Sequence, residues 1–279
     1  MDLRAVEIPV VVDDGHRFSL YARIPPAPRA TLLWLGGMGI AARHFLPFAE
    51  AVAARGIAVF VPDWRGLGSS SVRAGRDCDW GYRELLVHDL PACEAAVAQA
   101  VPHLPRLLGG HSLGGQLASV RAGLAPGSAS ALWLVASGTP YWRAFPAGTR
   151  WWLPLAYRTL DGIARAYGKL PGRRIGFGGE ESRGVMRDWS RTGLGGRYAA
   201  ARFDVDLELA LQRVELPVHA VRMHHDWLAP ASSLAALLAK MPQARARIVA
   251  LDTAAPGIRA DHYAWMKQPA ATVAALLAG

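Results

Sequence analysis

The stretch that decides the fold is Leu107-Leu108-Gly109-Gly110-His111-Ser112-Leu113-Gly114-Gly115. A short apolar run enters it, and helical periodicity follows from residue 115 to residue 124. A serine between two glycines at such a strand-to-helix junction lies on a tight turn, where an added Cβ at either glycine would collide with neighbouring backbone. The turn presents the hydroxyl of Ser112 at the end of the sheet, in front of the N-terminus of the following helix. Ser112 is therefore the candidate nucleophile.

Outward from this turn, strand and helix patterns alternate along the chain. Continuous apolar runs predict buried strands, and 3.6-residue periodicity predicts helices. The predicted strands are 7–12, 17–24, 30–35, 57–61, 107–110, 131–136, 217–223 and 246–251. The predicted helices are 43–55, 82–101, 115–124, 232–239 and 264–277. Asp13-Asp14-Gly15-His16 is a hairpin signal between the first two strands. The pattern predicts an α/β fold with a mostly parallel eight-stranded sheet, helices on both faces and an antiparallel edge.

The alternation stops between residues 139 and 213, where Trp, Tyr, Arg and Gly are frequent. We interpret 139–213 as a mainly helical cap inserted between two parts of one core, 1–138 and 214–279. Most aromatic side chains of such an insertion form its own core, and two or three are expected to face a substrate. The residues that we expect to contact substrate are Gly37, Trp142 and Trp227.

A serine nucleophile needs a base that takes its proton and a carboxylate that orients the base. Asp226 follows the predicted strand 217–223, and His262 follows the next predicted strand and precedes the last helix. Both therefore lie at the carboxyl ends of strands, where sheets of this class gather their active sites. We take His262 as the base and Asp226 as the acid.

Rival residues stand close to these two. Asp252 is the alternative acid, and His224 or His225 is the alternative base. His224-His225-Asp226 also invites interpretation as a metal cluster, but adjacent histidines rarely face one ion and no further ligand set is spaced for it. We expect no metal and no cofactor.

Acyl transfer also requires donors for a developing oxyanion. One is expected to be the backbone N–H of Leu113, directly after the nucleophile. The other is expected in Gly37-Met38-Gly39, after the strand that contains Trp34, and the N–H of Met38 is our choice. Glycines in this loop allow the backbone to approach a substrate closely.

Composition bounds the remaining possibilities. The formal charge is +9, but the basic residues are scattered and form no nucleic-acid motif, so no nucleic-acid partner is expected. Cys78 and Cys93 cannot form a disulfide framework, which is typical of a reducing compartment. We see neither a signal peptide at the N-terminus nor an apolar run long enough to span a membrane. We expect a cytoplasmic protein without a membrane partner, and the sequence is compatible with a homodimer.

These motifs together resemble the α/β-hydrolase fold superfamily. Gly110-His111-Ser112-Leu113-Gly114 looks like its nucleophile elbow, Asp226-Trp227-Leu228-Ala229-Pro230 its acid loop, and His262-Tyr263-Ala264-Trp265 its histidine loop. Residues 63–70 are similar to a turn of the lipase-like and proline-iminopeptidase-like branches, and we interpret them as mostly structural. Residues 183–189 resemble a bacterial subgroup of uncharacterised predicted hydrolases. Many members have His-Gly where this chain has Gly36-Gly37.

The resemblance implies hydrolysis of a small-molecule carboxylic ester or thioester through an acyl-enzyme. An acyltransferase with the same triad and a ligand-binding receptor with little turnover are the alternatives. A serine nucleophile argues against dehalogenases and epoxide hydrolases, which use aspartate. A proline-directed aminopeptidase needs an acidic cap residue for the substrate amine, and Glu180 and Glu181 are candidates. Residues 140–213 contain 13 Lys or Arg against 7 Asp or Glu, which disfavours a cationic substrate.

Overall fold

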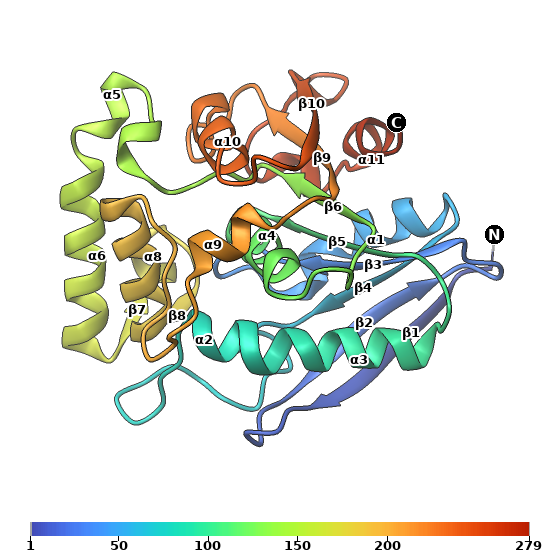
Figure 1. Ribbon diagram of the computed structural model, residues 1–279, viewed down its shortest axis with the longest axis horizontal. Coiled ribbons are helices and arrows are strands. Elements are labelled where there is room, and N and C mark those ends of the chain that lie inside the picture. The colour runs from blue at the N-terminus through green and yellow to red at the C-terminus, as the bar shows by residue number, and fades with distance from the viewer. Residues whose placement is uncertain (1, 279) are drawn as a thin grey trace.

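The apolar runs of the sequence form an eight-stranded sheet in the computed structural model, which describes residues 2–278 (Figure 1). The strand order is β1-β2-β4-β3-β5-β6-β9-β10. The pairs β1–β2 and β2–β4 are antiparallel, and the other neighbouring strands are parallel, as predicted. The strands are β1 Arg4–Val11, β2 Arg17–Ile24, β3 Ala30–Leu35, β4 Ile57–Pro62, β5 Arg106–His111, β6 Ala131–Val135, β9 Pro217–Met223 and β10 Arg245–Leu251.

Helices cover both faces of this sheet, because its central strands are apolar on both sides. Every residue of β3, β4 and β6 is buried. Two helices, α1 (Leu46–Ala53) and α11 (Ala270–Leu277), contribute to the apolar core on one face. Helices that contribute to the core on the other face include α3 Leu90–Ala100, α4 Leu113–Leu124, α9 Leu207–Gln212 and α10 Ala231–Leu238.

Two predicted helices differ in detail, and proline explains both differences. The predicted helix 264–277 is a 3₁₀ turn, η4 (Ala264–Met266), followed by α11, because Pro269 has no N–H to continue a helix. The predicted helix 82–101 begins as α2 (Tyr82–Glu84), widens into the π-helical segment η2 (Leu85–Asp89) and continues as α3. Pro91 stands in the first turn of α3, where its ring would crowd a regular preceding turn.

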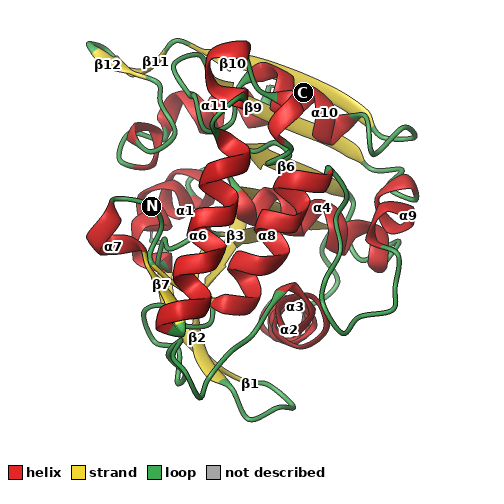
Figure 2. Cartoon of the chain, turned by 90° about the vertical axis from the view of Figure 1, so that its left-hand side faces the viewer, coloured by secondary structure: helices red, strands yellow, loops and turns green. Residues whose placement is uncertain are grey.

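Residues 139–195 form a layer of helices beside the carboxyl ends of the central strands. In Figure 2, α6 (Leu153–Tyr167) and α8 (Arg183–Gly195) lie side by side. The aromatic ring of Tyr157 packs directly on Gly193, which permits this close approach. The smaller elements of the segment are η3 Trp142–Ala144, α5 Ala147–Arg150, β7 Lys169–Pro171, α7 Gly172–Ile175 and β8 Glu180–Ser182, with β7 and β8 paired as an antiparallel hairpin. We call residues 139–195 the cap.

The helix α9 belongs to the sheet side of the molecule although it lies inside the predicted insertion 139–213. It packs against α4, and Gly123 allows the two backbones to approach at Ala210. Its N-terminus is capped by the Asp206 carboxylate, which accepts from the N–H groups of Glu208 and Leu209. The predicted boundary at residue 213 therefore includes one helix that covers the sheet.

A small pair of strands, β11 (Thr253–Ala255) and β12 (Ile258–Arg259), follows β10. The loop after β12 carries His262 back to the carboxyl edge of the sheet. Ser112 follows β5 and Asp226 follows β9 at this same edge. Three segments that are far apart in the sequence thereby meet under the cap.

Candidate active site

Ser112 lies on a strained turn between β5 and α4. Its backbone has φ 53° and ψ −121°, and residues other than glycine rarely adopt such a positive φ. The flanking glycines are required by space: a Cβ on Gly110 would overlap the backbone of Gly114, and one on Gly114 would overlap the carbonyl oxygens of Leu35 and Gly36. The structure therefore places the Ser112 hydroxyl at the head of α4, as the spacing of the glycines predicts.

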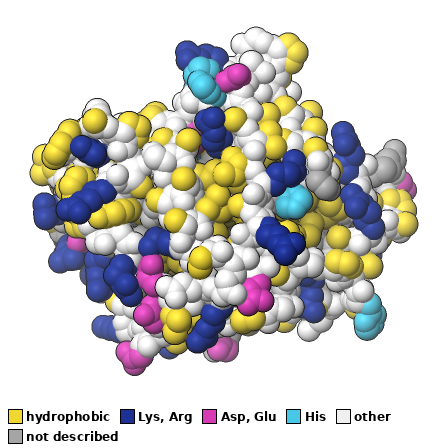
Figure 3. Space-filling model, turned by 45° about the horizontal axis from the view of Figure 1, so that its top comes forward, with side chains coloured by type: hydrophobic (Ala, Val, Ile, Leu, Met, Phe, Trp, Pro, Cys, Tyr) yellow, Lys and Arg dark blue, Asp and Glu magenta, His cyan; other side chains and the backbone are white. Residues whose placement is uncertain are grey.

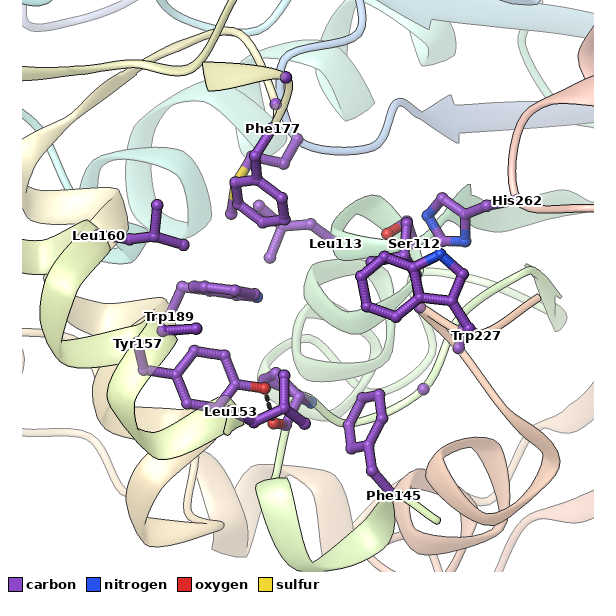
Figure 4. Close-up of a pocket in the computed structure, with 18 of the residues that line it drawn as sticks. Ser112, Leu113, Phe145, Leu153, Tyr157, Leu160, Phe177, Trp189, Trp227 and His262 are labelled. Atoms are coloured by element: carbon purple, nitrogen blue, oxygen red, sulfur yellow. Dashed lines mark hydrogen bonds between the residues drawn. The ribbon is translucent and has the colours of Figure 1, made fainter. Parts of the chain in front are cut away.

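His262 and Asp226 form a buried pair beside Ser112. The Nδ1 atom of His262 lies 2.7 Å from Oδ2 of Asp226, and the Asp226 side chain is fully buried. The other carboxylate oxygen accepts from the N–H groups of Leu228 and Ala229, at 2.9 and 3.0 Å. Because Asp226 is an acceptor throughout, it favours the His262 tautomer with hydrogen on Nδ1, which leaves Nε2 free to accept a proton. Figure 4 shows the His262 ring next to the Ser112 hydroxyl, at the wall of a cavity that both residues line.

The backbone of His262 is held by two buried side chains that sequence reasoning did not assign to the site. Nε2 of His111 donates to the carbonyl oxygen of His262 at 2.9 Å, and the indole N–H of Trp265 donates to the same oxygen at 3.2 Å. Burial, together with the neighbouring His262, holds the pKa of His111 well below its usual value, so His111 remains a neutral donor. The sequence signal that could have identified His111 as a support of the site is its position between Gly110 and Ser112, at the end of a buried strand.

The loop after β3 forms the other side of the site and is steadied by Trp64. The Trp64 indole N–H donates to the carbonyl oxygen of Gly36 at 2.8 Å. Asp63 Oδ1 accepts from the N–H of Ala42 at 2.9 Å, where the loop ends. Asp63 and Trp64 thus hold residues 36–42, in which Gly36-Gly37 replaces the His-Gly pair of many related chains. This agrees with the structural interpretation of residues 63–70.

Arg65, from the same turn, contributes to a buried ionic network outside the cavity. Its Nε lies 3.0 and 2.9 Å from the two carboxylate oxygens of Asp89, and its Nη2 lies 2.6 Å from Asp14. His16 contacts Asp89 at 3.2 Å and Ser70 at 3.0 Å. This network joins the opening hairpin to the start of α3, so its role is structural.

The two expected oxyanion donors come from two different segments, the start of α4 and the loop after β3. Leu113 is the first residue of α4, so its N–H has no acceptor within the helix. Met38 lies in a turn that is closed by the bond from the Ile40 N–H to the Gly37 carbonyl oxygen, at 3.2 Å. Met38, Leu113 and Ser112 all line the same cavity. Their placement is compatible with the predicted oxyanion hole.

Residues 36–42, which we call the oxyanion loop because they contain the predicted donor Met38, are touched by the cap backbone to backbone. Gly39 has φ +71°, and a Cβ on it would overlap the backbone of Gly178 and Gly179. Glu181 lies on β8, two residues after Gly179. It is buried, and its Oε1 atom has no hydrogen-bond partner among residues 2–278. Burial raises the pKa of the Glu181 carboxyl to about 7, and the N–H of Gly179 opposes this shift. A carboxyl that stays protonated to higher pH than an ordinary glutamate thus lies behind the contact between cap and oxyanion loop.

A cavity of about 610 Å³ opens between the cap and the head of α4. Its wall is mainly aliphatic and aromatic, and Figure 4 shows Trp189, Tyr157 and Leu153 on the side of Ser112 away from His262. Among residues 2–278, no Asp, Glu, Lys or Arg lines it. Trp152 of the cap and Trp227 of the acid loop meet at its mouth, with ring centroids 5.9 Å apart, and both are exposed. Hydrophobic side chains gather near the middle of the face shown in Figure 3, with Lys and Arg side chains around them.

Of the three expected substrate contacts, Trp227 lines this cavity but Gly37 and Trp142 do not. Gly37 faces inward, where a Cβ would collide with the ring of His111. Trp142 packs against the small apolar cluster of Phe145, Leu153 and Tyr157 and lies under the guanidinium of Arg143. Contact of these two residues with substrate therefore stays a prediction, and the contacts that the structure shows are the packing of Gly37 on His111 and of Trp142 in the core of the cap.

The rival acid and bases lie outside the cavity. His224 is paired with Asp252 at 3.2 Å, and both side chains are more than half exposed. His225 Nδ1 lies 2.9 Å from the Arg259 guanidinium on the exposed surface. None of the three lines the cavity. Over the described part of the chain, no three His, Cys, Asp or Glu side chains are grouped as a metal site.

The two candidate carboxylates for a substrate amine, Glu180 and Glu181, lie outside the cavity. Glu180 pairs with Lys169 at 2.7 Å, which lowers the pKa of its carboxyl, and Glu181 is buried behind the oxyanion loop. Neither lines the large cavity.

No helix among residues 2–278 is both long and apolar enough to cross a bilayer.

The sheet order, the elbow and the cap define an α/β-hydrolase fold. Residues 26–174, more than half of the chain, match the family described as "Serine aminopeptidase, S33". The chain belongs to this family of α/β-fold serine hydrolases. No curated protein sequence matches it.

Solved structures with this fold carry several activities. A hydrolase from Pseudomonas aeruginosa PA01 superposes with a TM-score of 0.64 at 19% identity, covering 99% of this chain and 97% of that one. The ferulic acid complex of Est1E from Butyrivibrio proteoclasticus has a TM-score of 0.64 at 16% identity, with 95% and 96% covered. The thioesterase domain from the curacin biosynthetic pathway has a TM-score of 0.62 at 19% identity, with 99% and 100% covered. At these identities the likeness concerns the fold.

Proposed function

We propose that this hydrolase cleaves carboxylic esters or thioesters with an uncharged, largely apolar acyl group. The observation that carries the proposal is the cavity at Ser112, which is walled by apolar side chains and, among the described residues, by no Asp, Glu, Lys or Arg. A free substrate amine would find no carboxylate there, and a buried unpaired ammonium is strongly unfavourable. An ester or thioester of a hydrophobic acid meets no such penalty.

The chemistry follows from the arrangement of the three side chains. His262 Nε2 takes the proton of the Ser112 hydroxyl as Oγ forms a bond to the acyl carbon. Asp226 stabilises the resulting imidazolium, and the N–H groups of Met38 and Leu113 bind the oxyanion. His262 then gives its proton to the leaving alkoxide or thiolate, and the acyl group stays on Ser112. Water, deprotonated by His262, attacks the acyl carbon and releases the acid and the free Ser112 hydroxyl.

A fluorophosphonate probe and a panel of p-nitrophenyl esters of increasing chain length test this proposal. The probe should label Ser112, and esters should be hydrolysed while aminoacyl p-nitroanilides are not. Ser112→Ala, Asp226→Asn and His262→Ala should each lower kcat by roughly 10³-fold or more. The matched controls His224→Ala and Asp252→Asn remove an exposed histidine and an exposed aspartate and should leave kcat near that of the wild type.

Three results would contradict the proposal. Absence of both labelling and ester turnover would favour a receptor with little turnover. Efficient release of amino acids from aminoacyl anilides would favour a peptidase. Loss of activity in Asp252→Asn, with activity kept in Asp226→Asn, would assign the acid to Asp252.

A further inference from the structure

One polar side chain, Gln116, stands in the apolar wall of the cavity without a role in the proposed chemistry. It lies one turn into α4, and its backbone N–H donates to the Ser112 carbonyl oxygen at 3.2 Å. Helical side chains lean toward the N-terminus of their helix. The Gln116 side chain therefore leans toward the nucleophile from the turn behind it.

One end of the Gln116 amide is held and the other is free. The Tyr198 hydroxyl donates to Oε1 of Gln116 at 3.2 Å, and both residues are buried. Within residues 2–278 the amide nitrogen has no hydrogen-bond partner, yet it is not among the fully enclosed unpaired atoms. Because Gln116 lines the cavity and its side chain leans toward Ser112, its free N–H groups are available to a molecule bound there.

Of the other hydroxyl and imidazole groups that line the cavity, each is bonded, exposed or part of the proposed reaction. The Tyr157 hydroxyl donates to the Pro140 carbonyl oxygen. Thr159 and Tyr263 are exposed residues, and Ser112 and His262 serve the proposed reaction. Among the described residues, the buried Gln116 on α4 thus offers a neutral donor to a bound molecule, and the half-buried Trp189 on α8 of the cap offers its indole N–H as another. A donor in an apolar wall favours a ligand with an oxygen acceptor at that point, because an unpaired buried donor is unfavourable.

The position of Gln116 assigns this acceptor to the acyl half of the substrate. The leaving group receives its proton from His262 and so lies on the His262 side of Ser112. Figure 4 shows the apolar cavity extending from Ser112 in the other direction, toward Trp189 and Tyr157. The acyl chain occupies that side and passes the first turn of α4 close to its carbonyl carbon.

Resting on the proposed ester or thioester hydrolysis, we infer that Gln116 selects acyl groups that carry a hydroxyl or oxo oxygen near the carbonyl, such as β-hydroxyacyl groups. Gln116 donates to that oxygen, and Tyr198 is a positioning residue that fixes which end of the amide faces the cavity. The rest of the wall accepts the hydrocarbon part of the chain.

Three ethyl esters test the inference: hexanoate, β-hydroxyhexanoate as both enantiomers, and β-methylhexanoate, which matches the hydroxyl in size. The readout is the ratio of kcat/KM for the hydroxy ester to that for the methyl ester. One neutral hydrogen bond is expected to favour the better hydroxy enantiomer by roughly 3- to 10-fold. Gln116→Leu should bring the ratio close to one, and Gln116→Met provides a second variant with an unbranched chain. The control Gln99→Leu changes an exposed glutamine on α3 and should keep the ratio.

Tyr198→Phe separates positioning from bulk structure. It should lower the ratio by raising KM for the hydroxy ester, whereas a general loss of structure would affect all three esters alike. A wild-type protein without preference, or a preference that survives both Gln116 variants, would overturn the inference while ester hydrolysis stands. If no ester is hydrolysed and the fluorophosphonate probe does not label Ser112, the proposed function fails, and this inference fails with it.

Discussion

Replacing the buried carboxyl of Glu181 by an amide should change how stability depends on pH. Burial raises the pKa of Glu181 from 4.5 to about 7 in the folded protein, whereas the unfolded chain keeps the ordinary value. Between these two values the folded state binds more protons than the unfolded state. The free energy of unfolding contributed by this group therefore falls as the pH rises from about 4.5 to 7, and stays low above pH 7.

The size of the effect follows from the two pKa values. Each pKa unit is worth about 1.4 kcal/mol, so ionising Glu181 in the folded protein costs roughly 3 kcal/mol at pH 8. Glu181→Gln carries no charge at any pH. It should be more stable than the wild type at pH 8 by up to this amount and nearly as stable as the wild type at pH 4.5.

Urea unfolding of both proteins at several pH values between 4.5 and 8 measures the difference, and other titrating groups cancel in the comparison. Glu180→Gln is the matched control, because the pKa of Glu180 is lowered by its bond to Lys169 and its side chain is half exposed. In that control any loss of stability should be small and should appear at neutral pH. A difference between wild type and Glu181→Gln that stays constant over this pH range would refute the reasoning. A difference in favour of Glu181→Gln that grows as the pH is lowered would refute it as well.

Three further substitutions probe the supports of the site. Trp64→Phe removes the donor to the oxyanion loop and should cost about 1 kcal/mol of unfolding free energy. It should lower kcat by a larger factor than it raises KM. An unchanged kcat would show that Trp64 does not support that loop. Gly39→Ala should lower kcat/KM and the Tm together, because the methyl group meets the backbone of Gly179 at a positive φ, and wild-type values would show that the cap yields there. Arg65→Met leaves the buried Asp89 carboxylate without its arginine partner and should lower the free energy of unfolding by roughly 3–5 kcal/mol, as measured by urea unfolding. The kcat of the folded fraction should stay near that of the wild type.

The core of the fold was predictable because its signals are local. The strands β2, β3 and β9 coincide with the predicted ranges, since each is an uninterrupted β-rich run bounded by turn residues or proline. The break at Pro269 was missed because the apolar residues on either side suit one continuous helix. The packing of α9 on the sheet side was not predictable, because the face that α9 buries depends on its partner α4, which lies far away in the sequence.

The candidate site also has one part that the sequence predicts and another part that depends on the tertiary structure. The order of Ser112, Asp226 and His262 along the chain, each after a strand, is a sequence signal, and the structure brings the three together. The support of His262 by His111 depends on the tertiary structure, and so does the support of Gly36 by Trp64. The packing of Trp142 in the core of the cap was not predictable for the same reason, since nothing in the sequence distinguishes an aromatic residue that lines a cavity from one that packs in a core.

The positions of the tryptophan residues determine what the intrinsic fluorescence of the protein reports. The three exposed indoles, Trp151, Trp152 and Trp227, are at or next to the mouth of the cavity, and five others are buried in the sheet domain: Trp34, Trp64, Trp80, Trp133 and Trp265. Quenching of intrinsic fluorescence by acrylamide should therefore report mainly on the mouth. In Ser112→Ala, an acyl ligand that fills the cavity would shield Trp152 and Trp227 from the quencher. Occupancy can then be titrated without a label and without turnover, which separates recognition from chemistry.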